Sequence, residues 1–338
     1  MDLEKSIYGS MMGTALGDSI GLPFEALSRQ KIEKKNPKFL SQSLFFGKGM
    51  FSDDTEQTVA VAQTLIESYD DLELFQKGMR KRLQLWLLAL PSGLGFATMK
   101  AISKSFFVRD AGVFSAGNAP AMRSALLGLC FGDDTQKLQS FVHANTLLTH
   151  TDPKAYYGAL AVAKATYLSS LNQQDKFFIE MKTLIEDREF RAILQSVEEN
   201  LSISTTDYAL KLGFERGVGG YIYQTLPIAL HAWLRNQYNL KNAIRDVILC
   251  GGDTDTTGAI VGSIVGANNQ TTLPKEWSEG IIDYPISVKF IEENAKMLTQ
   301  VIQEQKTSKA PSTWWLLTLI RNMVFLMIVL VVSITRWF

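Results

Sequence analysis

The stretch CGGDTDTTGAIVGSIVGA, from Cys250 to Ala267, joins an acidic turn to a segment of small apolar residues. Two aspartates and three threonines follow a pair of glycines, and Gly258, Gly262 and Gly266 recur at every fourth position behind them. Helical spacing places these glycines on one face, where another element can approach closely. The stretch therefore predicts a closely packed helix whose first turn carries oxygen ligands for a hard cation such as Mg²⁺ or Mn²⁺.

An ordinary helix start is the alternative interpretation of this turn. Asp and Thr are favoured N-cap residues, and an Asp in the first turn suits the helix dipole. Capping needs only one such side chain, whereas adjacent carboxylates repel each other unless a cation or hydrogen bonds neutralise them. We therefore favour a metal site over a polar helix start.

A second acidic turn, Ser52-Asp53-Asp54-Thr55, begins another helix predicted by apolar spacing up to Tyr69. Asp53 and Glu56 also fit a capping box, which is the structural alternative. Two acidic turns at helix starts can face each other across a shared pair of cations. The related segment FGDDTQKL, 131–138, is interpreted instead as the start of a surface helix, because a charged segment follows it.

Helical periodicity dominates the rest of the chain. Residues 6–25 predict a helix with glycines at 9, 13 and 17, in which Asp18 is a candidate hydrogen-bonded core acid. Asp152 and Pro153 form a strong helix start. Strand signals are scarce, and no βαβ pattern is present. We expect an all-α fold in a single large domain.

Composition excludes some functions and favours a reducing compartment. The 338 residues carry no net formal charge and are 46% hydrophobic, so there is no electrostatic footprint for nucleic acid. Cys130 and Cys250 lie in apolar surroundings and are expected to be buried free thiols. The polar N-terminal residues do not resemble a signal peptide.

The C-terminal residues 314–338 form a hydrophobic segment interrupted only by Arg321, Asn322 and Arg336. Its length suffices to cross a bilayer, and tryptophans stand near both ends, as in an aromatic belt. Arg321 is expected to snorkel toward the near interface. A buried core helix is the alternative, but the preceding EQKTSKAPST is interpreted as a polar linker that detaches the segment.

These patterns divide the chain into a helical domain at 1–305, a polar linker at 306–313 and a membrane anchor at 314–338. A cytoplasmic body tethered by its tail is the simplest arrangement. Deletion of the residues after about Ser312 is then expected to leave a soluble, active body.

Six segments together resemble the ADP-ribosylglycohydrolase family, from about residue 6 to about residue 280. They are, in order, GDSIGLPFE, FSDDTEQT, SAGNAPAMR, LTHTDPKA, GGYIYQTLPIAL and GGDTDTTGAIVGSIVGA. The resemblance implies an orthogonal all-α bundle with a binuclear Mg²⁺ or Mn²⁺ centre in a cleft. It implies hydrolysis of the glycosidic bond between ADP-ribose and an acceptor, either a protein side chain or a small molecule.

The resemblance also assigns residues. The metal ligands would be Ser52, Asp53, Asp54, Asp253, Asp255 and Thr256. A catalytic carboxylate would come from Glu25, Asp53 or Asp54, and the identity of the base stays open. The substrate would contact Ser115, Gly117, Asn118, Ala119, Met122, His150, Gly220 and Tyr221, with 115–122 at the diphosphate and ribose and 219–221 at the adenosine side.

One departure bears on function. The family loop commonly reads GNG, whereas here Gly117 and Asn118 are followed by Ala119 and Pro120, which restrict the backbone. A catalytically silent, membrane-tethered protein that binds ADP-ribose or a related nucleotide is therefore kept as an alternative. A structural helical protein whose acidic turns are only caps is a third hypothesis.

Overall fold

Two antiparallel helices packed backbone to backbone form the centre of the molecule, α1 (Leu3–Gly21) and α15 (Thr254–Gly266). Glycines face each other along the pair: Gly9 against Gly266, Gly13 against Gly262, and Gly17 against Gly258. A Cβ atom added at Gly13 would lie only 2.0 Å from the carbonyl oxygen of Gly262. The close approach expected from the glycine spacing is therefore confirmed: the row of glycines on α1 packs directly against the row on α15.

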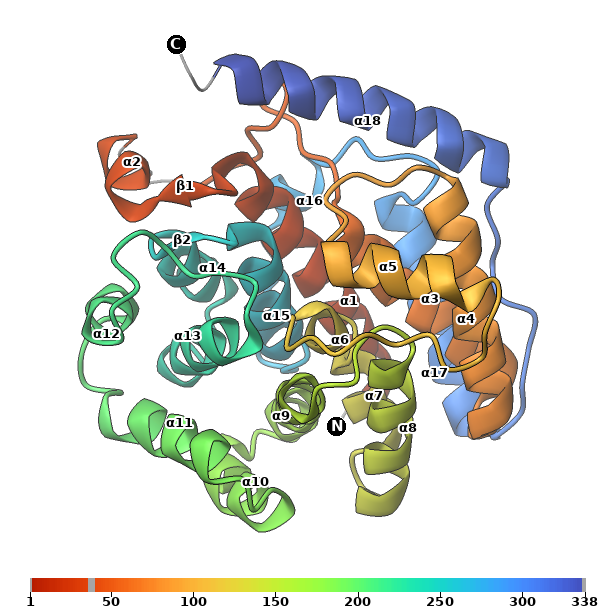
Figure 1. Cartoon of the computed structure of the whole chain (residues 1–338), viewed down its shortest axis with the longest axis horizontal. Helices are drawn as coiled ribbons and strands as arrows, with labels where there is room; N and C mark the ends of the chain where they lie inside the picture. Colours follow the sequence, from red (N-terminus) through yellow and green to blue (C-terminus); the bar gives the residue numbers. More distant parts are fainter. Residues whose placement is uncertain (1, 36–39, 336–338) are drawn as a thin grey trace.

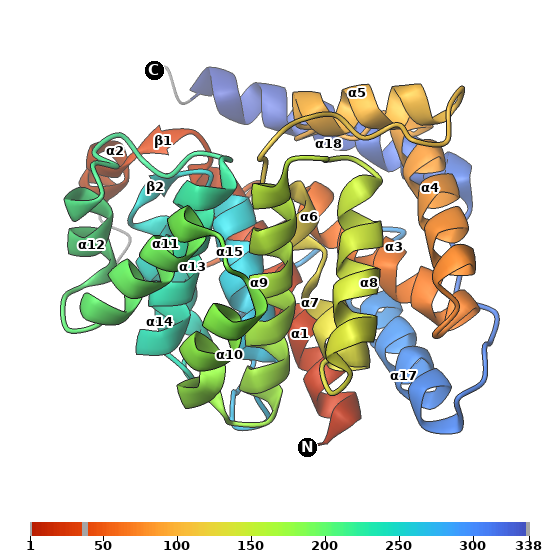
Figure 2. The same ribbon diagram turned by 60° about the horizontal axis from the view of Figure 1, so that its bottom comes forward.

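The computed structural model describes residues 2–35 and 40–335, with side chains described as far as Val332. Helices dominate, as expected for an all-α fold, and they cross at varied angles around the central pair (Figures 1 and 2). In chain order the other elements are η1 (Leu22–Phe24), β1 (Leu27–Ser28), α2 (Arg29–Lys34), α3 (Asp53–Ser68), α4 (Leu72–Leu88), α5 (Phe96–Ser105), α6 (Ala119–Met122), α7 (Ala125–Phe131), α8 (Thr135–Leu147), α9 (Pro153–Ser170), η2 (Gln174–Lys176), α10 (Phe177–Leu184), α11 (Arg188–Glu199), α12 (Thr205–Lys211), α13 (Ile222–Arg235), α14 (Leu240–Ile248), β2 (Gly251–Gly252), α16 (Lys275–Ser278), α17 (Val288–Glu304) and α18 (Trp315–Thr335).

Several helix starts match the sequence signals. Asp134 and Asp152 cap α8 and α9 through their side chains, and Pro153 is the first residue of α9. The capping box that was the alternative interpretation of the α3 start does not form. Ser52 is the N-cap residue of that helix and makes no side-chain capping bond, while Glu56 turns away to partners on α4 and α18.

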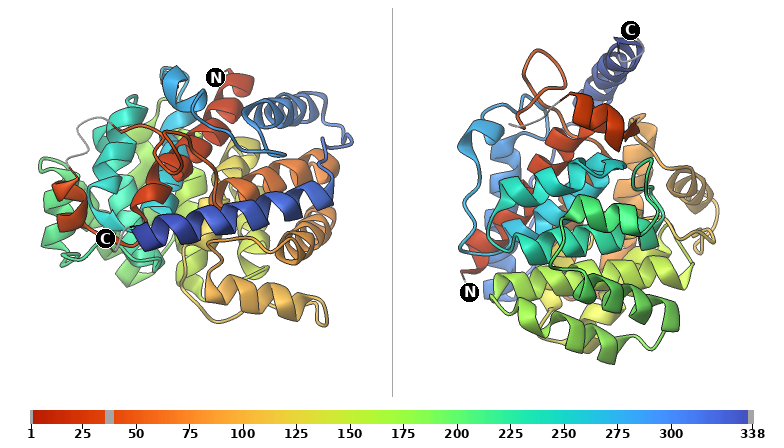
Figure 3. Two further views of the ribbon diagram at one scale, coloured as in Figure 1. Left: turned by 90° about the horizontal axis from the view of Figure 1, so that it is seen from above. Right: turned by 90° about the vertical axis from the view of Figure 1, so that its left-hand side faces the viewer.

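Helix α18 lies along the surface of the body (Figure 3). Its window Trp315–Val332 has a mean hydropathy of 2.3 and only 17% of it is buried, so by length and composition it is able to cross a membrane. The three residues that it buries deeply against the body are Arg321, Asn322 and Phe325. The helix therefore turns its polar Arg321 and Asn322 inward together with Phe325, while many of its apolar side chains are exposed, unlike those of a helix on a water-exposed surface.

The approach to α18 also contacts the body. The Ser308 amide donates to the carbonyl oxygen of Ile66, and the Gln63 side chain donates to the carbonyl oxygen of Pro311. The segment read as a polar linker thus runs along α3, and Arg321 is buried in the body where snorkelling toward a membrane interface was expected.

Candidate active site

The two acidic turns meet at the starts of α3 and α15. The Asp54 carboxylate accepts a hydrogen bond from the Ser52 hydroxyl in its own turn, at 3.0 Å, and one from the Thr256 hydroxyl in the other turn, at 3.2 Å. The two turns are 202 residues apart in the chain at this contact. Their predicted juxtaposition is therefore seen in the structure.

Asp18 fixes the first turn from the side of α1. Its carboxylate accepts hydrogen bonds from the Ser52 amide (2.9 Å), the Thr55 amide (3.1 Å) and the Thr55 hydroxyl (2.5 Å). Burial raises the pKa of Asp18 to about 6, although these donors lower it. The expectation of a hydrogen-bonded core acid is confirmed, and this acid holds the backbone on both sides of Asp53 and Asp54.

Glycines shape the second turn. Gly251 and Gly252 have positive φ angles, and β2 pairs with β1 so that Leu27 stands opposite Gly252. A Cβ atom at Gly252 would lie 2.1 Å from the carbonyl oxygen of Val218, which accepts the Asp253 amide at 2.7 Å. Only glycine fits here, and the consequence is a fixed backbone position for Asp253.

A cavity of about 470 Å³ opens over the two turns. Most of the residues predicted for the site line it, namely Glu25, Asp53, Asp253, Asp255, Thr256, Ser115, Gly117, Asn118, Ala119, Met122, His150 and Gly220. Three predicted residues do not line it: Ser52, Asp54 and Tyr221. Ser52 and Asp54 are buried, whereas Tyr221 is 39% exposed and its hydroxyl accepts a hydrogen bond from Lys154.

Part of the cavity wall was missed by the sequence analysis. Gly93, Gly95 and the first residues of α5, Phe96 to Thr98, line it together with Ala26 and Gly252. The sequence PSGLG at 91–95 contains helix-breaking residues, but nothing in it indicates that this segment lies near Asp53. A Cβ atom at Gly93 would in fact lie 3.1 Å from an Asp53 carboxylate oxygen.

The loop at 115–122 is tied to the second acidic turn. The Asn118 side-chain amide donates to Asp253 at 2.7 Å and to the Thr225 hydroxyl at 3.0 Å, and the Asn118 backbone amide donates to the carbonyl oxygen of Gly220. Ala119 and Pro120 begin α6 directly behind Asn118. The departure from GNG is thus accommodated by a short helix, and Asn118 still reaches the acidic turn.

Comparison with known proteins agrees with this geometry. The sequence model of the ADP-ribosylglycohydrolase family matches residues 1–308. The chain belongs to this family. It is 26% identical to ADP-ribosylhydrolase ARH3 of Gallus gallus, over 80% of this chain and 87% of that protein. It is 22% identical to the ADP-ribosyl-[dinitrogen reductase] glycohydrolase of Rhodospirillum rubrum, over 80% and 87% of the two chains.

A solved structure shares the fold of this glycohydrolase. It is described as an ADP-ribosylglycohydrolase-related protein complex and superposes with a TM-score of 0.70 at 22% identity, over 89% of this chain and 99% of the other. Family membership supports hydrolysis of glycosidic linkages of ADP-ribose.

The acidic floor of the glycohydrolase cavity is electrostatically strained. Burial, followed by repulsion from neighbouring carboxylates, raises the pKa of Asp53, Asp54 and Asp255 well above the usual range for aspartate. Repulsion of this kind favours either protons or a bound cation. Bound protons or a bound cation would therefore stabilise the folded site.

The residues fit a hard divalent cation. Carboxylate and hydroxyl oxygens are the donor types that Mg²⁺ and Mn²⁺ take. The Asp54 Oδ1 atom is fully buried and makes no hydrogen bond among the described residues. Within the same residues, no three His, Cys, Asp or Glu side chains already converge closely enough to hold an ion, so the fit rests on the donor types and on this buried oxygen.

His150 contributes a neutral ring to the cavity wall. Burial, together with the nearby Arg123 guanidinium, lowers the pKa of His150 to about 3. Its Nδ1 atom lies 2.9 Å from the Thr149 hydroxyl. Arg123, which the sequence analysis left without a role, is buried and donates to Gln57, Asn145 and Thr149, so it braces α3 against the His150 segment.

Proposed function

We propose that this glycohydrolase is a metal-dependent enzyme that releases ADP-ribose from a protein side chain or a small-molecule acceptor. Two cations, Mg²⁺ or Mn²⁺, would be held by Ser52, Asp53, Asp54, Asp253, Asp255 and Thr256. The observation that carries the proposal is the meeting of the two acidic turns at one cavity, with a buried Asp54 oxygen that makes no hydrogen bond among the described residues.

The reaction replaces one bond at the ribose C1″ carbon. The bond to the acceptor breaks through an oxocarbenium-like transition state, the oxygen of a water molecule bonds to C1″, and the protons of that water are shared between the new hydroxyl and the departing acceptor. When bound, the cations supply Lewis-acid stabilisation of developing negative charge. Glu25 and Asp53 line the cavity and are the candidates to accept the proton. Asp54 is buried and does not line the cavity, which favours a role as a metal ligand over a role as the base.

The rest of the cavity suits the ADP-ribose portion. The backbone of 115–119 and the uncharged His150 ring line the wall beside the acidic turns. Tyr221 directly follows the lining residue Gly220, and its ring stands beside Lys154, which also pairs with Glu189. An aromatic ring at the edge of a pocket can stack on an adenine base.

A release assay tests this function. Arginine-, serine- and phosphate-linked ADP-ribose would each be offered to the protein in Mg²⁺, in Mn²⁺ and in EDTA. We expect release of ADP-ribose from at least one of them, lost in EDTA and in the variants Asp53→Asn and Asp255→Ala. Tight binding of ADP-ribose by calorimetry, with no release under any condition, would favour the silent binding protein instead.

We also propose that α18 attaches the protein to a membrane, with the body on the cytoplasmic side. The apolar side chains exposed on this helix support the proposal: Trp315, Leu316, Ile320, Met323, Val324, Leu326, Met327, Leu330 and Val331. A row of this size on a monomer marks an interaction surface. Fractionation of cells that express the full chain tests it, and recovery in the soluble fraction without detergent would contradict it.

A further inference from the structure

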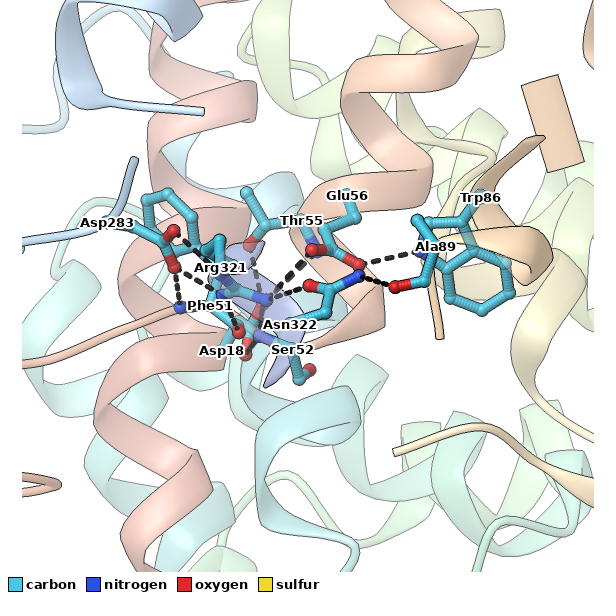
Figure 4. A network of polar contacts seen from close by, with 10 residues as sticks. All are labelled: Asp18, Phe51, Ser52, Thr55, Glu56, Trp86, Ala89, Asp283, Arg321 and Asn322. Atoms are coloured by element: carbon cyan, nitrogen blue, oxygen red, sulfur yellow. Dashed lines mark hydrogen bonds and ion pairs between the residues drawn. The ribbon is translucent and has the colours of Figure 1, made fainter. Parts of the chain in front are cut away.

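The Arg321 side chain of α18 is buried next to the first acidic turn, among Phe51, Glu56 and Asp283. We call these three residues the Arg321 socket. The Arg321 guanidinium donates to Glu56 at 2.9 Å, to Asp283 through Nε at 2.9 Å, and to the carbonyl oxygen of Phe51 at 2.6 Å (Figure 4). Both carboxylate side chains and the guanidinium are at least nine-tenths buried. Loss of any one charge would therefore leave an uncompensated charge in the protein interior.

Two residues of the Arg321 socket flank the acidic turn in the sequence, and the third contacts the same segment. Phe51 directly precedes Ser52, and Glu56 follows Asp54 by two residues. Asp283 contacts the same segment, because its carboxylate accepts the Phe51 amide at 2.8 Å. Arg321 therefore contacts both flanks of the turn, while Asp18 accepts hydrogen bonds from its Ser52 and Thr55 amides (Figure 4).

Neighbouring contacts keep α18 in register over the socket. Asn322 donates to the carbonyl oxygen of Ala89 at 2.8 Å, and its side-chain oxygen accepts from Arg321. The guanidinium also lies 4.3 Å from the ring centroid of Phe325, which packs with Leu22, Leu44 and Met50 in a small apolar cluster of its own. These contacts together fix the position of the Arg321 guanidinium.

We propose that Arg321 is a positioning residue for the metal-binding turn, so that α18 completes the metal site of the body on which it lies. The segment that supplies Ser52, Asp53 and Asp54 is held by Asp18 through its amides and by Arg321 with Asp283 through its flanking residues. Residues that orient metal ligands from outside the coordination shell affect metal affinity strongly, commonly by about 10- to 100-fold. The inference rests on the metal dependence proposed above.

The test measures Mn²⁺ binding to the full-length protein in detergent. Free Mn²⁺ would be followed by electron paramagnetic resonance, below the melting temperature of each variant. Arg321→Met is expected to weaken binding by about tenfold or more. Arg321→Lys keeps a charge but lacks the planar fork, and an intermediate affinity is expected. Arg82→Met is the matched control, since Arg82 pairs with Glu67 farther along α3, and binding within twofold of the unaltered protein is expected.

Amide exchange of residues 52–58 supplies a second readout. Loss of Arg321 is expected to speed exchange in this segment and to leave the segment around Arg82 unchanged. If Arg321→Met does not fold, the triple variant with Glu56→Gln and Asp283→Asn removes the unpaired buried charges while still lacking the bond to Phe51. That variant is expected to fold and to bind Mn²⁺ more weakly than the unaltered protein.

The possible failures can be told apart. Binding and exchange equal to those of the unaltered protein, in Arg321→Met or in the triple variant, would overturn the role of Arg321. An unaltered protein that binds no Mn²⁺ or Mg²⁺ would overturn the proposed metal dependence, and the exchange comparison would then still decide whether Arg321 orders the turn.

Discussion

At the scale of single residues, several carboxylates of the site are buried close together and repel one another. Asp53, Asp54 and Asp255 are all buried, and neighbouring carboxylates raise their pKa values in addition to burial. A carboxyl whose pKa is higher in the folded than in the unfolded protein binds more protons in the folded state. Without a cation, the free energy of unfolding therefore falls as pH rises above about 4 through the folded pKa.

This repulsion predicts a trade between stability and activity at Asp255. In EDTA at pH 8, we expect Asp255→Asn to raise the free energy of unfolding by about 1.4 kcal/mol or more, since each pKa unit is worth that amount. The gain should disappear near pH 4, and release of ADP-ribose should be lost at every pH. Denaturant unfolding across this pH range measures it, and an Asn variant less stable than the unaltered protein at pH 8 would contradict the account.

His150 predicts an opposite pH dependence. Because its pKa falls from about 6.5 to about 3 on folding, the unfolded chain binds the extra proton between these values. The free energy of unfolding should then decrease as pH drops below 6.5, by up to about 1.4 kcal/mol per pH unit from this ring. In EDTA, His150→Gln should show a shallower acid slope than the unaltered protein. The exposed His143→Gln variant is the control and should keep the original slope.

At the scale of elements, the packing of α1 on α15 fixes where both acidic turns begin. Gly21 at the end of α1 accepts from the Thr254 hydroxyl at 2.9 Å, and Asp18 on the same helix holds the first turn. The two helices therefore act as one rigid unit that carries one acidic turn directly and holds the other through hydrogen bonds. The repeated glycines were a reliable sequence signal because only a missing Cβ allows this approach.

A single methyl group should disturb this unit. A Cβ atom at Gly262 would lie 2.1 Å from the carbonyl oxygen of Gly13, which is backbone and has no freedom to rotate away. We expect Gly262→Ala to lower the free energy of unfolding by about 1–3 kcal/mol or more, as overpacking does. Gly95→Ala is the control, because no atom lies within 4 Å of its added Cβ. Equal thermal unfolding of the two variants would argue against the backbone contact.

At the scale of the whole molecule, α18 belongs to the body as well as to any membrane. The sequence alone leads to the expectation that removal of the tail leaves an intact, active enzyme. The structure leads to a different expectation, because deletion of α18 removes Arg321, the ionic partner of Glu56 and Asp283. Removing one partner of a buried ion pair costs about 3–5 kcal/mol.

We therefore expect the chain ending at Ser312 to be less stable than the full chain, by at most that amount because water can reach the uncovered carboxylates, and to bind Mn²⁺ more weakly. Glu56→Gln and Asp283→Asn, introduced into the shortened chain, should restore part of the stability. Chemical denaturation of the three proteins in the same detergent measures the effect. A shortened chain as stable as the full one would show that the socket tolerates unpaired charge.

The sequence predicted the local features of the site well and its long-range contacts poorly. Helix starts, the glycine stripes and both acidic turns follow from spacing and residue type, which act over a few residues. The partner of Glu56 was not predicted, because Arg321 is 265 positions away along the chain. The wall formed by Gly93 to Thr98 was missed for the same reason. The roles assigned to individual site residues stay predictions until the variants are measured.

The distance between Glu56 and Arg321 along the chain also has a consequence for biosynthesis. The ribosome makes the acidic turn early and α18 late, so the body emerges with its socket still lacking a cation. Burial raises the pKa of the Glu56 carboxyl, and attraction to Arg321 is the largest of the effects that lower it. A nascent body would thus hold Glu56 and Asp283 without their ionic partner until translation ends. Maturation of the metal site would then be a post-translational event, timed by the arrival of the last helix.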